Sequence, residues 1–308
     1  MKKMMFYLSL CAVLPLALHA HDATSQASPM KVRVDSVELH YVEQESGIPV
    51  VFIHGGLEDY RAWDEQVGPF AQRYRVIAYS RRYNYPNSGA PVGNSYSAIV
   101  DAEDVAALIK RLKLAPAHIV GNSYGAYTAL ILAWRHPELV RSLVLSEPPV
   151  LKWLPEIEGG KALFAEFMSK VWEPTSRGFQ KGDEEGVQAA VDGFGEIGYS
   201  GTDQKMTFAT LPPEVRNGLL QNAAEWRVLT MSKDAFPNMV PSAIKRIKAP
   251  TLLLGGGRSL KLANMIDGRL ERLLPHGQRF ILADATHEMW NEFPAECRNA
   301  AIKFIDNH

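Results

Sequence analysis

Apolar and polar positions from Lys31 onward alternate between short, strand-like segments and longer, helix-like ones. Short apolar runs such as residues 50–53 are typical of strands buried on both faces of a parallel sheet. Apolar residues at helical spacing over residues 97–114, with Ser95 or Ser97 able to cap the start, predict an amphipathic helix. The expected strands are 31–34, 37–42, 50–53, 75–79, 118–121, 143–146, 251–254 and 279–282; the expected helices are 60–74, 97–114, 124–136 and 294–306. This alternation predicts an α/β fold with a mostly parallel sheet covered by helices on both faces.

The pattern changes between Pro149 and Pro250, where no buried strand is evident. Helical spacing instead covers residues 159–172, 183–194 and 212–232, in a stretch rich in Trp, Phe and Met. We therefore expect a core formed by residues 30–149 and 250–308, with residues 150–249 inserted as a helical cap. Most aromatic residues of the cap are expected to pack among its own helices, while a minority line an apolar pocket.

The N-terminus has the three parts of a secretory signal peptide: Lys2 and Lys3, an apolar stretch over residues 4–18, and a small residue at Ala20. We expect residues 1–20 to be removed after Ala20, with Ala23 as the second choice, and residues 21–29 to form a flexible leader. A membrane anchor is the alternative, but the apolar stretch is shorter than the ~20 residues that a span needs. The sequence thus predicts a periplasmic or secreted protein without stable membrane insertion.

Composition narrows the functional classes further. The 308 residues contain 33 Lys and Arg against 34 Asp and Glu, so no basic surface for nucleic acid is expected. Removal of the signal peptide takes away Cys11 and leaves Cys297 as a single cysteine, which excludes an internal disulfide. Cys297 has apolar neighbours in a helical pattern, so we expect a small buried residue rather than a nucleophile.

The most informative residues are Gly121-Asn122-Ser123-Tyr124-Gly125, between an expected strand and an expected helix. A serine on a sharp strand-to-helix turn projects its hydroxyl into open space, and small flanking residues relieve the crowding there. This context predicts that Ser123 is a nucleophile, whereas the simpler alternative is a helix-capping serine. The N–H of Tyr124, at the start of the helix, is placed to stabilise an oxyanion.

A second glycine-containing segment, His54-Gly55-Gly56, follows the strand at residues 50–53. Glycines allow the chain to bend and leave an N–H uncovered, so Gly56 is our candidate for the second oxyanion donor. We expect His54 to hold this loop rather than to act in catalysis. His287 is the expected base, because it follows the last strand and a short loop, at the end of the sheet where Ser123 also lies.

With these residues in place, the chain from Lys31 to His308 resembles the α/β-hydrolase superfamily. The resemblance is carried by residues 54–56, the 121–125 turn and Asp284-Ala285-Thr286-His287. It implies an α/β-hydrolase fold with a mostly parallel eight-stranded sheet and a helical cap inserted after the sixth strand. It also implies a triad of serine, acid and histidine. Asn122 replaces the histidine that frequently precedes the nucleophile.

The acid is the least certain member of this triad. The loop after the seventh strand, the usual position, has no carboxylate over residues 255–261. Glu147, after the sixth strand, occupies an alternative position seen in some haloalkane dehalogenases, and Pro148-Pro149 are expected to stiffen it. Asp284 lies only three residues before His287, and Asp267 lies on an expected helix. We favour Glu147 and expect its carboxylate within about 3.2 Å of His287 Nδ1.

The sequence therefore predicts a serine hydrolase that cleaves a small-molecule carboxylic ester or lactone, with an apolar part, through Ser123, His287 and Glu147. The same triad also cleaves C–C bonds or acts as a perhydrolase, and some proteins of this fold are non-catalytic small-molecule receptors. No metal or organic cofactor is implied, since the sequence has no ligand cluster and no phosphate loop. The oligomeric state and the particular ester or lactone stay open.

Overall fold

The apolar segments form one eight-stranded sheet in the computed structural model, which describes residues 29–87, 95–198 and 206–308. The expected signal peptide and, apart from Pro29, the expected leader lie outside these residues. The strands are β1 (Met30–Val34), β2 (Val37–Gln44), β3 (Pro49–Ile53), β4 (Arg75–Tyr79), β5 (Ala117–Asn122), β6 (Val140–Ser146), β7 (Thr251–Gly256) and β8 (Gly277–Leu282). Their order across the sheet is β1-β2-β4-β3-β5-β6-β7-β8, and only the β1–β2 and β2–β4 pairs are antiparallel. The mostly parallel sheet expected from the sequence is thus confirmed.

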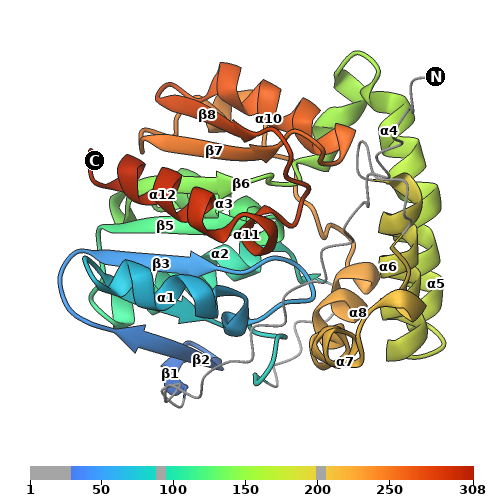
Figure 1. Ribbon diagram of the computed structural model, residues 1–308, viewed down its shortest axis with the longest axis horizontal. Coiled ribbons are helices and arrows are strands. Elements are labelled where there is room, and N and C mark those ends of the chain that lie inside the picture. The colour runs from blue at the N-terminus through green and yellow to red at the C-terminus, as the bar shows by residue number, and fades with distance from the viewer. Residues whose placement is uncertain (1–28, 88–94, 199–205) are drawn as a thin grey trace, which may run out of the picture.

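Helices cover both faces of the sheet because alternate strand residues point to opposite sides. Val50 and Phe52 of β3 pack in a core with α1, α11 and α12, whereas Val51 and Ile53 pack in a core with α2, α3 and α10. Figure 1 shows α1, α11 and α12 in front of the sheet. These helices are α1 (Asp64–Ala71, after the short helix Tyr60–Trp63), α2 (Ala98–Arg111), α3 (Tyr124–Arg135, followed by Pro137–Leu139), α10 (Lys261–Leu273), α11 (Met289–Glu292) and α12 (Pro294–Ile305). Ser97 stands at the start of α2 as expected, but its side chain makes no capping hydrogen bond.

Between β6 and β7, every element of the described residues is helical, as the sequence pattern indicates. These elements are Leu151–Glu156, α4 (Gly160–Phe167), a π-helical turn (Met168–Trp172), α5 (Glu173–Phe179), α6 (Asp183–Ile197), Phe208–Thr210, α7 (Pro213–Gln221), α8 (Ala223–Met231) and α9 (Pro241–Ile244). Figure 1 shows these helices beside the carboxyl ends of the parallel strands, and we refer to residues 150–249 as the cap. The cap therefore covers the edge of the sheet where the candidate site residues lie.

The helical spacing over residues 212–232 corresponds to two helices, α7 and α8. Asn222 lies between the two helices, and its side chain contacts residues of the core. Its amide accepts a hydrogen bond from Tyr85 N at 2.8 Å and donates one to Asp59 Oδ2 at 2.8 Å. These tertiary contacts hold Asn222 outside helical geometry and separate α7 from α8.

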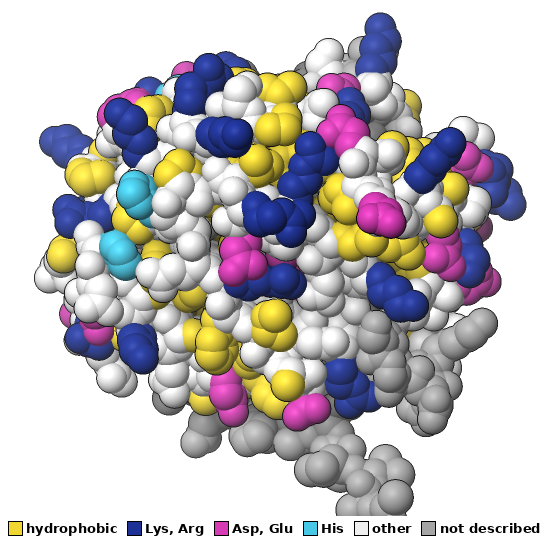
Figure 2. Space-filling model, turned by 90° about the horizontal axis from the view of Figure 1, so that it is seen from above, with side chains coloured by type: hydrophobic (Ala, Val, Ile, Leu, Met, Phe, Trp, Pro, Cys, Tyr) yellow, Lys and Arg dark blue, Asp and Glu magenta, His cyan; other side chains and the backbone are white. Residues whose placement is uncertain are grey.

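The molecular surface has a mixed charge character. On the face drawn in Figure 2, basic and acidic side chains lie interspersed. Among the described helices, none has the length and apolar character needed to cross a bilayer.

Candidate functional site

Ser123, Glu147 and His287 lie at the carboxyl edge of the sheet because each follows a strand of that sheet. Ser123 follows β5, Glu147 follows β6, and His287 lies five residues beyond the end of β8. Carboxyl ends of parallel strands meet at one edge, where ligands of open α/β sheets bind. The three sequence-predicted residues therefore share one end of the molecule, beneath the cap.

The backbone at Ser123 is a strained turn between β5 and α3. Ser123 has φ 49° and ψ −117°, a conformation that costs energy for any residue other than glycine. A Cβ at Gly121 would lie 2.8 Å from the backbone of Ala126, and one at Gly125 would lie 2.2 Å from the carbonyl oxygen of Ile53. Both flanking positions thus require glycine, which is the crowding that the sequence pattern indicated.

Ser123 and Glu147 are joined through the pairing of β5 with β6. Asn122 pairs with Ser146, and the N–H of Ser123 donates to the carbonyl oxygen of Ser146 at 2.7 Å. Glu147 is the next residue and also has a positive φ, 49°, which turns its side chain away from the strand direction. Trp290, three residues after His287, donates to Ser146 Oγ at 2.7 Å and so anchors the histidine segment to the same strand.

Glu147 contacts His287 as the sequence analysis expected. Glu147 Oε2 lies 2.5 Å from His287 Nδ1, and the glutamate is only 2% exposed. The same carboxylate accepts hydrogen bonds from Gly256 N at 2.8 Å and from Ser259 Oγ at 2.6 Å. These donors compensate the carboxylate for the water that it has lost. The end of β7 and the loop after it, which have no acid, thus supply the donors that hold an acid from the loop after β6.

The neighbouring carboxylates alter the basicity of His287. Burial opposes the charged imidazolium, but the hydrogen bond and the charge of Glu147 outweigh it, with smaller contributions from Glu288 and Glu58. Together they raise the pKa of His287 to about 9. Because Glu147 occupies Nδ1, Nε2 is the ring nitrogen left for Ser123. Within the described residues no hydrogen bond joins Ser123 to His287, so proton transfer between them belongs to the proposal below.

The two competing acids do not contact His287. Asp284 is exposed to solvent. Asp267 lies on α10, is fully buried, and has no hydrogen-bond partner among the described residues. Burial and the nearby charge of Glu147 raise the pKa of Asp267 well above its usual range. Asp267 lies on a helix, as expected, but its electrostatic coupling to Glu147 was not foreseen.

The two expected oxyanion donors come from the start of α3 and from the loop after β3. Tyr124 is the first residue of α3, so its N–H has no acceptor within the helix. Gly56 lies in the loop after β3 (residues 54–58, hereafter the oxyanion loop), where a Cβ would come within 2.6 Å of Trp226 Nε1 of the cap. Gly56 is therefore required for the cap to approach this loop. His54 has the structural role expected of it: its Nδ1 donates to the carbonyl oxygen of Gly55 at 2.8 Å.

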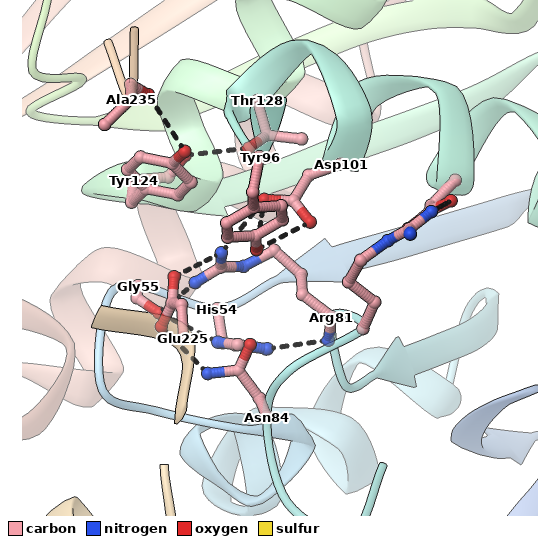
Figure 3. Close-up of polar contacts among 12 residues, drawn as sticks. His54, Gly55, Arg81, Asn84, Tyr96, Asp101, Tyr124, Thr128, Glu225 and Ala235 are labelled. Atoms are coloured by element: carbon pink, nitrogen blue, oxygen red, sulfur yellow. Dashed lines mark hydrogen bonds and ion pairs between the residues drawn. The ribbon is translucent and has the colours of Figure 1, made fainter. Parts of the chain in front are cut away.

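A buried charged cluster next to the oxyanion loop was missed by the sequence analysis (Figure 3). Its central members, Arg81, Asp101 and Glu225, are each at most 1% exposed. Arg81 pairs with Glu225 at 2.5 Å and with Asp101 at 3.2 Å, and its guanidinium lies 4.8 Å from the centre of the Tyr124 ring. The available signal was Glu225 itself, an acidic residue between the apolar residues Ala224 and Trp226.

Aromatic side chains of the cap cluster above the turn that carries Ser123. Phe236 lies 5.5 Å from Tyr124 and 5.3 Å from Trp172 between ring centres, and Trp172 lies 6.2 Å from Trp226. A separate cavity of about 290 Å³ lies between the cap and the start of α10, and its mixed lining includes Leu163 and Leu260 as well as Glu166 and Lys261. Leu260 follows Ser259, the hydroxyl donor to Glu147, so this cavity adjoins the loop that holds the acid.

Two further features bear on the chemistry. Cys297 is fully buried, and burial raises the pKa of its thiol to about 12, as expected of an inert cysteine. In the part of the chain that the structure describes, no group of three or more His, Cys, Asp or Glu side chains is arranged to hold a metal ion.

Comparison with known proteins extends these observations. A family model described as alpha/beta hydrolase fold matches residues 48–290. A 2-hydroxy-6-oxo-6-phenylhexa-2,4-dienoate hydrolase from Comamonas testosteroni is 33% identical over 114 residues, which cover 36% of this chain and 40% of that protein. The chain spans about half the length of three of the curated relatives that it matches.

Solved structures share the fold. Carboxylesterase CesB (YbfK) from Bacillus subtilis has a TM-score of 0.69 at 18% identity, covering 92% of this chain and 93% of its own. Est816, described as an N-acyl homoserine lactone degrading enzyme, has a TM-score of 0.69 at 23% identity, covering 89% of this chain and 100% of its own. At these identities the likeness concerns the fold.

Proposed function

Because the chain belongs to the alpha/beta hydrolase fold family, we propose that it is a serine hydrolase that cleaves a carboxylic ester or a lactone. The observation that carries the proposal is the pair of features at one edge of the sheet. Ser123 stands on a strained turn with φ 49°, and Glu147 holds His287 through a 2.5 Å contact to Nδ1. A nucleophile, a base and a residue that orients the base are the parts that acyl transfer requires.

In the proposed reaction, Ser123 Oγ attacks the carbonyl carbon while His287 Nε2 takes its proton. Glu147 fixes the tautomer of the ring and stabilises the imidazolium that forms. The N–H groups of Gly56 and Tyr124 stabilise the oxyanion of the tetrahedral intermediate. His287 then gives the proton to the leaving alkoxide, and an acyl group stays on Ser123. Water, deprotonated by His287, releases the carboxylic acid and regenerates the serine.

The substrate class follows from the surroundings of this site. The aromatic ring of Phe236 in the cap lies against Tyr124, at a centre-to-centre distance of 5.5 Å. This aromatic contact next to Ser123 favours a small molecule with an apolar part next to its ester group. The names of the structural neighbours, a carboxylesterase and an enzyme that degrades N-acyl homoserine lactones, support an ester or a lactone.

Cleavage of a C–C bond is the second candidate. The local 33% identity to the Comamonas testosteroni hydrolase favours it, since the name of that protein specifies a dienoate rather than an ester. Substrate tests separate the possibilities: an esterase turns over short p-nitrophenyl esters, and releases p-nitrophenol in a burst equal to the enzyme concentration where deacylation is the slower step. Cleavage of a vinylogous diketone without turnover of the esters would favour the second candidate.

We also propose that the protein is exported, with removal of residues 1–20. The proposal is supported by Lys2 and Lys3, the apolar stretch that follows them, and Ala20. Intact-mass analysis of periplasmic or secreted protein is expected to give a chain that begins at His21. Cytoplasmic protein that begins at Met1 would contradict export.

A further inference from the structure

Glu225 of α8 is a buried carboxylate of the cap that contacts the oxyanion loop directly. It is fully buried, and its Oε2 accepts hydrogen bonds from Leu57 N at 3.0 Å and from Asn84 Nδ2 at 2.9 Å. Its Oε1 lies 2.5 Å from Arg81 Nη1. Figure 3 shows Glu225 extending towards Arg81 and Asn84. The cap thus places a negative charge beside the residue that follows Gly56.

Arg81 contacts the residue that precedes Gly56. Its Nη2 donates to the carbonyl oxygen of Gly55 at 2.7 Å, and the same oxygen accepts from His54 Nδ1. His54 is neutral, since its Nε2 accepts from Arg81 N at 3.0 Å, and burial together with the Arg81 charge lowers its pKa to about 3. Two donors therefore fix the direction of the Gly55 carbonyl.

These contacts determine where the Gly56 N–H points. A trans peptide unit is planar, so the carbonyl of Gly55 and the N–H of Gly56 point in opposite directions. Holding the Gly55 oxygen on Arg81 and His54 consequently aims the Gly56 N–H away from them. Glu225 fixes the next peptide unit through Leu57 N, where the chain has a positive φ of 58°. Both peptide planes around Gly56 are held by one ion pair that joins the core to the cap.

We propose that Glu225, acting with Arg81, is a positioning residue that aims the Gly56 N–H at the oxyanion, so that docking of the cap completes the oxyanion site. This inference rests on the proposed serine hydrolase function, with Gly56 as a donor. Oxyanion stabilisation depends on donors held in place before the reaction. Removing the ion pair leaves Ser123, His287 and Glu147 in place but lets the Gly56 N–H turn.

The chain offers a matched control in the adjacent residue. Arg82 and Asp104 form a second buried ion pair, with contacts of 2.6 and 2.7 Å, and are 6% and 5% exposed. Neither side chain contacts the oxyanion loop. Asp104→Asn therefore imposes a comparable loss of a buried charge pair without altering the contacts of Gly55 and Leu57.

The test compares Glu225→Gln, Glu225→Ala and Asp104→Asn with the wild type. For each protein, kcat and KM are measured with a p-nitrophenyl ester, and Ki with a trifluoromethyl ketone and its methyl ketone analogue. The trifluoromethyl ketone forms a hemiketal with Ser123 whose oxygen occupies the oxyanion site, whereas the methyl ketone reports ground-state binding. All measurements are made well below the melting temperature of each variant.

We expect kcat to fall about tenfold in Glu225→Gln and about a hundredfold in Glu225→Ala, with KM changed less than about twofold. The Ki of the trifluoromethyl ketone is expected to rise by the same factors, while Asp104→Asn leaves kcat and both Ki values within about twofold.

Equal losses in Asp104→Asn and Glu225→Gln, or unchanged kcat and Ki in Glu225→Gln, would overturn the inference. A wild type that shows neither a burst nor modification of Ser123 would instead overturn the proposed function and the inference with it. If Glu225→Ala does not fold, the kcat and Ki of Glu225→Gln, which conserves the shape of the side chain, test the inference.

Discussion

Glu147 and Glu225 are two buried carboxylates that each hold a basic side chain at 2.5 Å, yet they serve different purposes. Each also accepts hydrogen bonds from two further donors, so neither carboxylate lacks compensation for burial. Glu147 extends from the end of a central strand to a histidine that can lose its proton. Glu225 extends from a cap helix to an arginine that cannot. We infer that the first pair moves a proton, whereas the second pair only holds a loop.

Ser123→Ala removes the proposed nucleophile, on which both pairs are inferred to act, so it has the largest expected effect. We expect turnover of an ester substrate to fall about 10³–10⁶-fold, because the nucleophile is lost while the oxyanion donors stay. Steady-state kinetics on a p-nitrophenyl ester, with a melting curve to show that the variant folds, measure the effect. Turnover within tenfold of the wild type would mean that neither carboxylate acts on Ser123.

Glu147→Gln tests the proton-moving pair and is expected to lower kcat about 10³–10⁴-fold, since the amide no longer stabilises the imidazolium. The loss should greatly exceed that of Glu225→Gln. Asp267→Asn is the control, because it alters the neighbouring buried acid without removing a contact of His287. If Asp267→Asn loses more activity than Glu147→Gln, the acid of the triad has been assigned to the wrong residue.

The pH dependence of activity distinguishes the Glu147–His287 pair, whose histidine titrates, from the Glu225–Arg81 pair, whose arginine stays charged. The serine attack needs neutral His287, so kcat/KM should rise with pH through the His287 pKa of about 9. Glu147, Glu288 and Glu58 are the charges that raise this pKa. Glu288→Gln removes one of them, so the rise should move to lower pH by about 0.3–0.5 units, giving about two- to threefold more activity at pH 7.5. A profile already flat above pH 7 in the wild type would contradict this account of His287.

Alkylation of Cys297 is expected to have the smallest effect, namely none. The thiol is fully buried and its pKa is raised to about 12. Iodoacetamide should therefore neither alkylate Cys297 nor change the activity of the folded protein. Unfolded protein, which should react fully, provides the control. Rapid modification with loss of activity would show that this cysteine is accessible near the site.

The sequence predicts the contact between Glu147 and His287 but not the contact between Glu225 and Arg81, because the first depends on strand ends and the second on how a cap helix docks. Ser123 is marked by a local motif between a strand and a helix, and His287 and Glu147 follow strand ends that the apolar pattern locates. Sheet topology alone then brings these residues to one edge. The absence of an acid over residues 255–261 left Glu147 as the favoured acid, and its contact with His287 was predicted before the fold was known.

Arg81 and Glu225 lie 144 positions apart, and their contact depends on the rotation and docking of α8. Helical spacing indicates that residues 212–232 are helical, but it does not fix which face meets the oxyanion loop. The helices separate at Asn222, whose side chain contacts Tyr85 and Asp59, and these long-range contacts are not visible in the local sequence. Likewise, residues 255–261 are noted in the sequence only for lacking an acid, whereas Gly256 and Ser259 supply the donors that hold Glu147.

Covalent labelling tests the central claim, that Ser123 is an activated nucleophile, most directly. The wild-type protein is incubated with a p-nitrophenyl alkylphosphonate, and the modified peptide is identified by mass spectrometry, with Ser123→Ala as the control. The account predicts one phosphonyl group per chain, on Ser123, formed faster as the pH rises towards 9, with no labelling of the variant. Labelling of another serine while Ser123 stays unmodified would contradict it.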